Sequence, residues 1–363
     1  MVNERNLLIW LNHLGGISYQ MVLDLIDYFG NLMEIWDADA GHLYKVLTNH
    51  RIIVEKMLKT RGKQDLKNIM DYNSGQDFYI RTILDEDYPN KLKNIYNPPY
   101  VLFLKGITKL EKPLVSIVGA RKSTAYGRWA AKMFAKQLVE WDVGIISGLA
   151  MGIDAEAHKG AIDAHGYTVA VLGCGINICY PKSNHQLYKE VEKAGCIISE
   201  YGPNIKPLKH NFPARNRIIS GLSDAVIVVE AGEQSGTLIT VGHALDQGKD
   251  VFALPGNINN YQSKGTNKLI KEGANILLDI EDVIEELKYK YSLESKKAKV
   301  EIKESLSREE MKIYDIIKKE SLHIDLISYK SGINISNLNR ILTILELKGF
   351  IQQTKGKIFT ACN

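Results

Sequence analysis

The segment Ala225–Glu230, which reads AVIVVE, constrains the fold more than any other part of the chain. A near-continuous run of β-branched residues is typical of a strand buried on both faces, as in a parallel sheet that helices cover on each side. Similar segments alternate with helical patterns between about Phe78 and Tyr289. We predict strands at 114–119, 144–147, 168–172, 197–199, 225–230, 251–254 and 276–278, and helices at 126–140, 154–165, 184–194 and 237–247. This alternation predicts an α/β fold with a doubly wound, mostly parallel sheet, whose ligands bind beyond the carboxyl ends of the strands.

Length and composition are those of an ordinary globular protein. The 363 residues suffice for two or three domains, and the net charge of +4 is mild. No apolar run is long enough to cross a bilayer, and the N-terminal MVNERNLLIW is too polar for a secretory signal, so we expect a cytoplasmic protein and no membrane partner. The four cysteines show neither CxxC pairing nor zinc spacing: Cys174, Cys179, Cys196 and Cys362. We therefore expect free thiols, with no metal and no cofactor.

Smaller regions flank the predicted sheet domain, which spans 78–290. Residues 1–75 read as several short helices, and their turn Leu14-Gly15-Gly16-Ile17 resembles the phosphate-holding hairpin of helix-hairpin-helix modules, although a plain helix–helix connection also accounts for it. A charged linker is predicted at 291–303. Residues 304–363 then show a helix at 308–318, the segment 324–329, a turn at 331–334 and a helix at 336–348. A terminating glycine and a β-hairpin turning at 355–356 follow, which gives the order of a winged helix.

A basic segment precedes the strand at 225–230. Between positions 206 and 217 it carries Lys206, Lys209, Arg215 and Arg217, and no acid. Phe212 lies among these cations, and an aromatic ring beside positive charge is a common way to hold a single strand, because charge follows the backbone while the ring stacks on a base. An alternative is that Phe212 anchors the loop in the core. The segment predicts a polyanionic ligand, most simply nucleic acid.

The loops that follow the strands carry residues suited to phosphate. The first loop, SIVGARKSTAYG, offers Gly119 for a tight turn, Arg121 as a permanent cation, and the hydroxyls of Ser123 and Thr124 at the start of a helix. It lacks the GxGxxG spacing of a dinucleotide site, which argues against an NAD enzyme. The strand at 225–230 is followed by Ser235-Gly236-Thr237, where the backbone amides of a helix start attract an anion.

Two other strand-end loops carry side chains that occur in catalytic sites, but neither shows a complete catalytic arrangement. The turn at Gly148 leads into a helix in which Asp154 and His158 share a face. They could form an acid–base pair, but an acid in the first helical turn also complements the helix dipole. Cys174 lies where a nucleophile could stand, yet no base is assigned to it. We therefore predict a binding protein and not an enzyme.

Several of these segments, in this order, resemble the DNA-processing protein A (DprA/Smf) family: SIVGARKST, SGLAMGIDAEAH, AVLGCGINICYP, NFPARNRIISGLSDAVIVVEA, SGTLITVGHALDQGKDVFALPGN and GTNKLIKEGA. The resemblance covers about 180 residues. It implies an extended Rossmann-like fold, an N-terminal SAM/helix-hairpin-helix-like domain, a C-terminal winged-helix domain and a homodimer. It also implies binding of single-stranded DNA without catalysis, protection of incoming strands during natural transformation, and loading of a RecA-type recombinase in homologous recombination.

Carried over residue by residue, the resemblance places Gly119, Arg121, Lys209, Phe212 and the run Arg215-Asn216-Arg217 in the DNA pocket. Ser123, Gly148 and the turn Ser235-Gly236-Thr237 complete the predicted site. Two alternatives remain at this point. One is a nucleotide-binding or nucleotide-hydrolysing Rossmann-like enzyme, although the diglycine turn of such relatives reads Glu233-Gln234-Ser235-Gly236-Thr237 here. The other is a duplex-DNA regulator acting through the winged helix, whose third helix carries few cations for base readout.

Overall fold

The computed structural model describes residues 2–110, 112–293, 295, 306–354 and 356–361. These residues form two compact units, Met1–Leu293 and Glu294–Asn363, which are described separately. Residues 294 and 296–303 of the predicted linker lie outside the described residues, as does Cys362. Within the described part of the chain, no helix is long and apolar enough to span a membrane.

The first unit is built on a nine-stranded sheet in the described part of the chain, with the order β1-β2-β6-β5-β4-β3-β7-β8-β9. The strands are β1 (Tyr79–Thr82), β2 (Val101–Gly106), β3 (Leu114–Gly119), β4 (Gly144–Ser147), β5 (Thr168–Val171), β6 (Cys196–Ser199), β7 (Ala225–Glu230), β8 (Asp250–Ala253) and β9 (Asn275–Ile276). All neighbouring strands from β6 to β9 in this spatial order pair in parallel. Strand β2 pairs antiparallel with both β1 and β6. The predicted doubly wound, mostly parallel sheet is confirmed.

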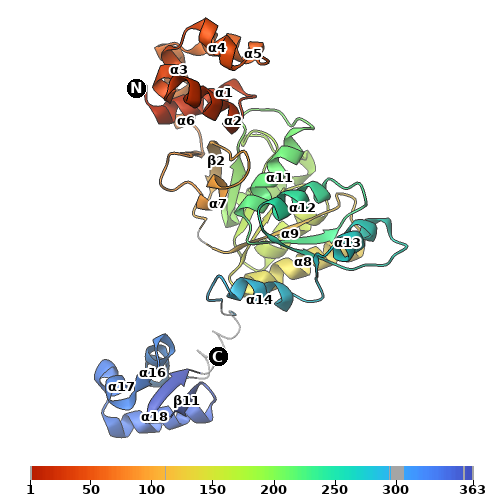
Figure 1. Ribbon diagram of the computed structural model, residues 1–363. Coiled ribbons are helices and arrows are strands. Elements are labelled where there is room, and N and C mark those ends of the chain that lie inside the picture. Colours follow the sequence, from red (N-terminus) through yellow and green to blue (C-terminus); the bar gives the residue numbers. More distant parts are fainter. Residues whose placement is uncertain (1, 111, 294, 296–305, 355, 362–363) are drawn as a thin grey trace. The chain divides into compact units, whose positions relative to one another are not determined.

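Helices cover both faces of the sheet (Figure 1). They are α7 (Asn90–Lys93), α8 (Ala125–Glu140), α9 (Ile153–Asp163), α10 (His185–Ala194), α11 (Asn211–Leu222), α12 (Thr237–Asp246), α13 (Tyr261–Lys271) and α14 (Glu281–Lys288). Alternate residues of each central strand enter different cores. Ile117 and Ile227 pack with α8, α9 and α14, whereas Val118 and Val228 pack with α7, α11 and α12. Burial on both faces explains the continuous apolar runs in the sequence.

The chain reverses its direction of winding at β3. From β3 it proceeds through β4, β5 and β6 on one side, and from β7 through β8 and β9 on the other. The neighbours β3 and β7 therefore define the topological switch point, where the loops at the carboxyl ends of the strands part and leave a crevice. The register between β3 and β7 also shifts at Val118/Gly119, an irregularity of the kind often found beside binding sites.

The N-terminal residues form six helices: α1 (Glu4–Leu14), α2 (Tyr19–Phe29), α3 (Leu32–Asp37), α4 (Ala40–Val46), α5 (Arg51–Thr60) and α6 (Lys63–Ser74). Side chains of Asn3, Ser18, Asn31 and Asp39 cap the first four of them by accepting hydrogen bonds from backbone amides. The core of these helices continues into the sheet unit through Tyr100 and Phe103. They therefore share one hydrophobic core with the edge of the sheet.

The second unit has the winged-helix arrangement that the sequence predicts. It comprises α16 (Arg308–Lys319), β10 (Leu322–His323), α17 (Ile324–Ser331), α18 (Ile335–Leu347), β11 (Ile351–Thr354) and β12 (Ile358–Ala361). The last two strands pair antiparallel as the wing, and β10 adds to β12. Gly349, with φ of 77°, follows the end of α18 in the left-handed conformation expected of a terminating glycine.

Several elements differ from the sequence-based prediction. The sequence pattern missed three strands and five helices: β1, β2, β10, α4, α6, α7, α13 and α14. Residues 206–217 were predicted as a basic arm, but Asn211 begins the helix α11 and the last cations of the arm lie on it. Pro213 lies in the first turn of α11, where its missing amide proton has no partner to lose. The arm is thus a short exposed loop followed by a helix.

Candidate nucleic-acid interface

A cavity of about 630 Å³ opens at the switch point and gathers most of the predicted site residues. This first cavity is lined from the predicted set by Gly119, Arg121, Lys209, Phe212, Arg215, Asn216, Ser235, Gly236 and Thr237. They come from the loops after β3 and β7 and from the start of α11. Because parallel strands end at one edge of the sheet, residues more than a hundred positions apart in sequence meet here.

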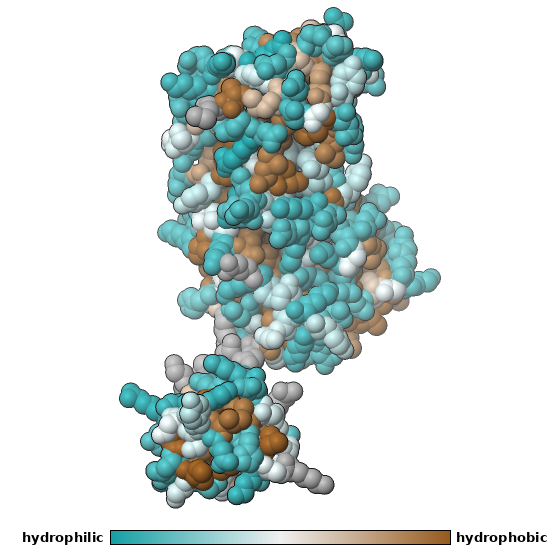
Figure 2. All heavy atoms as spheres, turned by 60° about the vertical axis from the view of Figure 1, so that its left-hand side comes forward, coloured by the Kyte–Doolittle hydropathy of each residue, from teal (hydrophilic) through white to brown (hydrophobic). Residues whose placement is uncertain are grey.

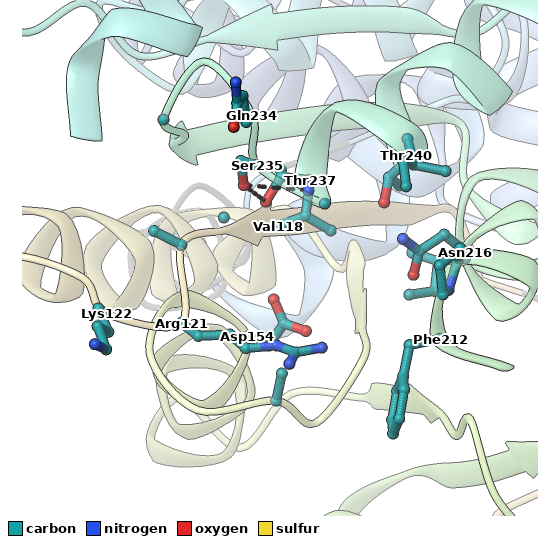
Figure 3. A pocket seen from close by; sticks show the side chains of 18 of the residues that line it. Val118, Arg121, Lys122, Asp154, Phe212, Asn216, Gln234, Ser235, Thr237 and Thr240 are labelled. Carbon is teal, nitrogen blue, oxygen red and sulfur yellow. Dashed lines mark hydrogen bonds between the residues drawn. The ribbon is translucent and has the colours of Figure 1, made fainter. Parts of the chain in front are cut away.

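One wall of the first cavity is a turn that leads into a helix. Ser235 Oγ lies 3.0 Å from Thr237 Oγ1 and accepts a hydrogen bond of 3.2 Å from the Thr237 amide. Gly236 is the N-cap of α12, and no heavy atom would lie within 4 Å of a Cβ added there. The hydroxyls of Ser235, Thr237 and Thr240 lie together on one side of the cavity (Figure 3). Together with the start of α12, they form a wall suited to an anion.

The opposite wall carries cations and aromatic rings. Lys122, Arg121 and Phe212 lie on this side (Figure 3). The guanidinium carbon of Arg121 lies 5.5 Å from the centre of the Phe212 ring, and the ring of Tyr180 lies 5.4 Å from the same ring. Phe212 is half-buried, and a Cβ added at Gly173 would lie 2.7 Å from its ring. One side of the ring is therefore anchored against the protein, and another side is available to the cavity. Phe212 can thus anchor its loop and also stack on a ligand.

Arg215 lies at the base of the cavity as a buried side chain. Only 4% of it is exposed, and its Nη1 donates to the carbonyls of Gly148, at 2.9 Å, and Val171. Asp154, at 7% exposure, accepts a hydrogen bond of 3.1 Å from the Gly148 amide. Burial raises the pKa of Asp154, and the guanidinium of Arg215 acts against that rise. Arg215 therefore holds the loop after β4 as well as contributing positive charge to the cavity.

Three predicted site residues do not line this cavity. Arg217 points to the other side of α11, where it donates two hydrogen bonds, of 2.8 and 2.5 Å, to the carboxylate of Glu200. Gly148 lies beneath the cavity, because a Cβ there would come within 2.5 Å of the Arg215 guanidinium. Ser123 lies just beyond it and accepts a hydrogen bond from Arg128 through its carbonyl oxygen. These placements give Arg217 and Gly148 structural roles.

The candidates for catalysis are held within the fold. His158 is fully buried, its Nδ1 lies 2.7 Å from Thr168 Oγ1, and burial lowers its pKa to about 3. It faces Thr168, so the pairing with Asp154 that their spacing suggested is not formed. Burial raises the pKa of the Cys174 thiol to about 11. Glu230 accepts hydrogen bonds from the amide and hydroxyl of Thr124, which also caps α8 as predicted.

Sequence reasoning overlooked several contributors to the first cavity, among them Thr240 and four further residues. Lys122 follows Arg121 directly and was recognisable as a second cation in the same loop. Tyr180 lies in the loop that begins near Cys174, a residue considered only as a possible nucleophile. Tyr261 and Gln262, at the start of α13, also line the cavity. Gln262 Nε2 donates to the carbonyl of Lys122 at 2.8 Å. No local motif marks these two residues, since α13 itself was not predicted.

Fold and site together define a Rossmann-like protein with a crevice at its switch point, lined by cations and hydroxyls, and an added winged-helix module. Comparison with known proteins identifies its family. Residues 79–288 match the model of DNA recombination-mediator protein A, and residues 297–357 match that of the DprA winged helix domain. The chain belongs to the DNA recombination-mediator protein A family, as the resemblance of its motifs predicted.

The similarity extends over most of several characterised relatives. DNA processing protein DprA of Bacillus subtilis is 45% identical over 70% of this chain and 89% of that protein, and its counterpart in Streptococcus pneumoniae is 38% identical over 76% and 95%. The X-ray structure of the S. pneumoniae protein covers 77% of this chain and 96% of its own, with 36% identity and a TM-score of 0.67. A structure reported for the single-stranded DNA binding mode of DNA processing protein A from Helicobacter pylori covers 59% and 98%, with 33% identity and a TM-score of 0.54.

Proposed function

We propose that this protein binds single-stranded DNA in the first cavity, protects incoming strands and loads a RecA-type recombinase onto them during natural transformation or homologous recombination. The observation that carries the proposal is the cavity itself. It combines the exposed cations Arg121, Lys122 and Lys209 with the helix-start turn at 235–237 and the ring of Phe212. Cations and amides suit the phosphates, and the rings suit unpaired bases. The H. pylori relative, reported with a single-stranded DNA binding mode, supports this ligand.

We propose further that binding proceeds without chemical turnover. A nucleophilic cysteine needs a thiolate, which the raised pKa of Cys174 disfavours. The buried His158 faces Thr168, and the carboxylate of Glu230 is engaged by Thr124. These contacts support a binding site over the nucleotide-hydrolysing alternative.

The winged-helix unit fits a protein contact better than readout of duplex DNA. The third helix carries Arg340 and is followed by Lys348, but Lys348 forms an ion pair of 2.9 Å with Glu310. Apolar side chains are exposed on this unit among polar ones (Figure 2), including Tyr329 at 87% and Leu347 at 83% exposure. Cations within reach of base edges are what duplex readout requires. We therefore assign this unit to a partner protein.

We also propose that the protein is a cytoplasmic homodimer. Strand β9 is an open edge of the sheet, and the apolar side chains of Ile276 and Leu278 beside it are 48% and 73% exposed. An open sheet edge can pair with another chain, and neighbouring exposed apolar groups can mark a contact surface. A light-scattering mass of one chain at micromolar concentration would refute the dimer.

The decisive experiment compares a labelled single strand with the same sequence as duplex at two salt concentrations. We expect preference for the single strand, and affinity that falls with salt by about −0.7 logarithmic units per phosphate neutralised. Arg121→Ala should weaken binding and reduce the slope by about one phosphate contact. Arg51→Ala is the matched control, because Arg51 is 80% exposed but lines neither this cavity nor the second one described below. Equal affinity for duplex and single strand, or cleaved DNA after incubation, would contradict the proposal.

A further inference from the structure

A second cavity, of about 770 Å³, lies on the other side of α11. It separates the turn at 14–17 of the N-terminal helices from the loop that precedes α11. Tyrosine rings and two prolines form much of its wall: Tyr19, Tyr96, Pro98, Pro99, Tyr100 and Tyr201. Tyr96 is 85% exposed and therefore stands at the rim. The cavity is thus walled largely by aromatic rings and apolar groups, and it is open to solvent beside an aromatic ring.

The two cavities share one dividing segment. Lys209 and Phe212 line the first cavity, while His210 and Asn211 line the second. Neighbouring residues at the start of α11 therefore face opposite sides. A strand that is held at Lys209 needs to pass only this short ridge to reach the second cavity.

Two amide side chains in the second cavity carry polar atoms without a partner. Among the described residues, neither Asn12 Oδ1 nor Asn211 Nδ2 has a hydrogen-bond partner, although both atoms are buried. Asn211 as a whole is only 4% exposed. A buried polar atom without a partner costs about 1–3 kcal/mol, which a ligand can recover. Both residues line the second cavity, where a ligand that has both a donor and an acceptor matches these two unpaired atoms.

The charged groups of the second cavity are engaged by the protein itself. Arg217 pairs with Glu200, and Lys56 Nζ donates to the carbonyl of Leu14 at 3.1 Å. Lys56 keeps its charge, but the second cavity offers a phosphate fewer free cations than the first, which has Arg121, Lys122 and Lys209. A nucleobase matches the second cavity better, because its faces stack on aromatic rings and its edge presents donors and acceptors together.

We propose that the second cavity holds a nucleobase of the same single strand whose phosphates occupy the first cavity. This inference rests on the proposed function. The strand crosses the ridge at Lys209–His210, the base stacks on Tyr96, and its edge meets Asn12 and Asn211. The second cavity adds affinity through stacking and hydrogen bonding, and adds no phosphate contact.

The test uses the full chain and two oligothymidylates, one of about four nucleotides and one of about sixteen, which bracket the site sizes of compact single-strand binders. Tyr96→Ala should weaken binding of the longer strand at least about fivefold, the lower end of the stacking effect for one base. Binding of the shorter strand should not change. The salt slope should also stay constant, because no phosphate contact is lost. Tyr289→Ala is the matched control, since Tyr289 is 86% exposed and lines neither cavity.

An abasic position moved along the longer strand provides a second measurement. At one position it should weaken binding by the wild type, and it should have little further effect on the Tyr96→Ala variant. Unchanged affinity of Tyr96→Ala for the longer strand would overturn the inference, as would an equal loss for both lengths. Failure of the wild type to bind either strand would refute the proposed function itself, so the two failures can be told apart.

Discussion

Replacing Arg215 by alanine should destabilise the protein far more than removing the exposed Arg121 from the same cavity. The Arg215 guanidinium bonds the carbonyls of Gly148 and Val171 at the ends of two central strands. The positive charge of Arg215 also acts against the rise that burial causes in the pKa of Asp154. Alanine would leave this carboxylate and two carbonyls without the guanidinium that serves them.

The magnitude follows from the burial of these groups. Arg215→Ala leaves two buried carbonyls without their donor, at about 1–3 kcal/mol each, and removes the cation that acts on the buried Asp154, so the total cost should be about 3–5 kcal/mol. This is a large part of the 5–15 kcal/mol that stabilises a typical domain. With a urea dependence of about 1–3 kcal/mol per molar, the unfolding midpoint should fall by more than about 1 M.

Tryptophan fluorescence isolates the relevant transition. All four tryptophans lie in the first unit, at positions 10, 36, 129 and 141, so unfolding of the second unit does not contribute. Arg121→Ala is the matched control and should stay within about 0.5 kcal/mol of the wild type, since its side chain is exposed. Arg215→Lys should fall between, because lysine keeps the charge but not the planar fork. A midpoint for Arg215→Ala within about 0.3 M of the wild type would refute a structural role.

Two further outcomes are expected. Burial lowers the pKa of His158 to about 3, below its ordinary 6.5. Between these two values the unfolded chain binds a proton that the folded chain does not. The free energy of unfolding should therefore fall by about 2 kcal/mol from pH 7 to pH 5. In urea titrations, the His158→Gln variant should not show this fall in the free energy of unfolding. An unchanged pH dependence in the variant would contradict the role given to His158. Truncation after Leu293 should leave a folded unit that binds single-stranded DNA, and Tyr291 must be kept because its hydroxyl donates to Asp224 at 2.8 Å. A loss of affinity beyond about a hundredfold, about 2.7 kcal/mol, would place a principal DNA site in the second unit.

The central sheet and the location of the site were predictable because they depend on local patterns. Strands such as Ala225–Glu230 are buried on both faces, so their sequences are almost entirely apolar. Parallel strands bring their following loops to one edge, so the turn at 235–237 and Arg121 could be expected together. The edge strand β1 was missed because four residues give little periodicity to recognise. Strand β2 pairs antiparallel with both of its neighbours, so it lies outside the strand–helix alternation from which the parallel strands were predicted.

By itself, the sequence determined the order of strands and helices, the switch-point crevice and its cationic loop. Burial selects apolar residues and turns select particular residue types, so both can be recognised locally in the sequence. The tertiary structure alone decided the separate fates of the two arginines on α11. Positions 215 and 217 differ by about 200° around a helix, so one guanidinium enters the base of the first cavity while the other meets Glu200 on the opposite side. The donor and acceptor of the second cavity were also invisible in the sequence. Asn12 and Asn211 approach the same space only because the N-terminal helices pack beside the start of α11.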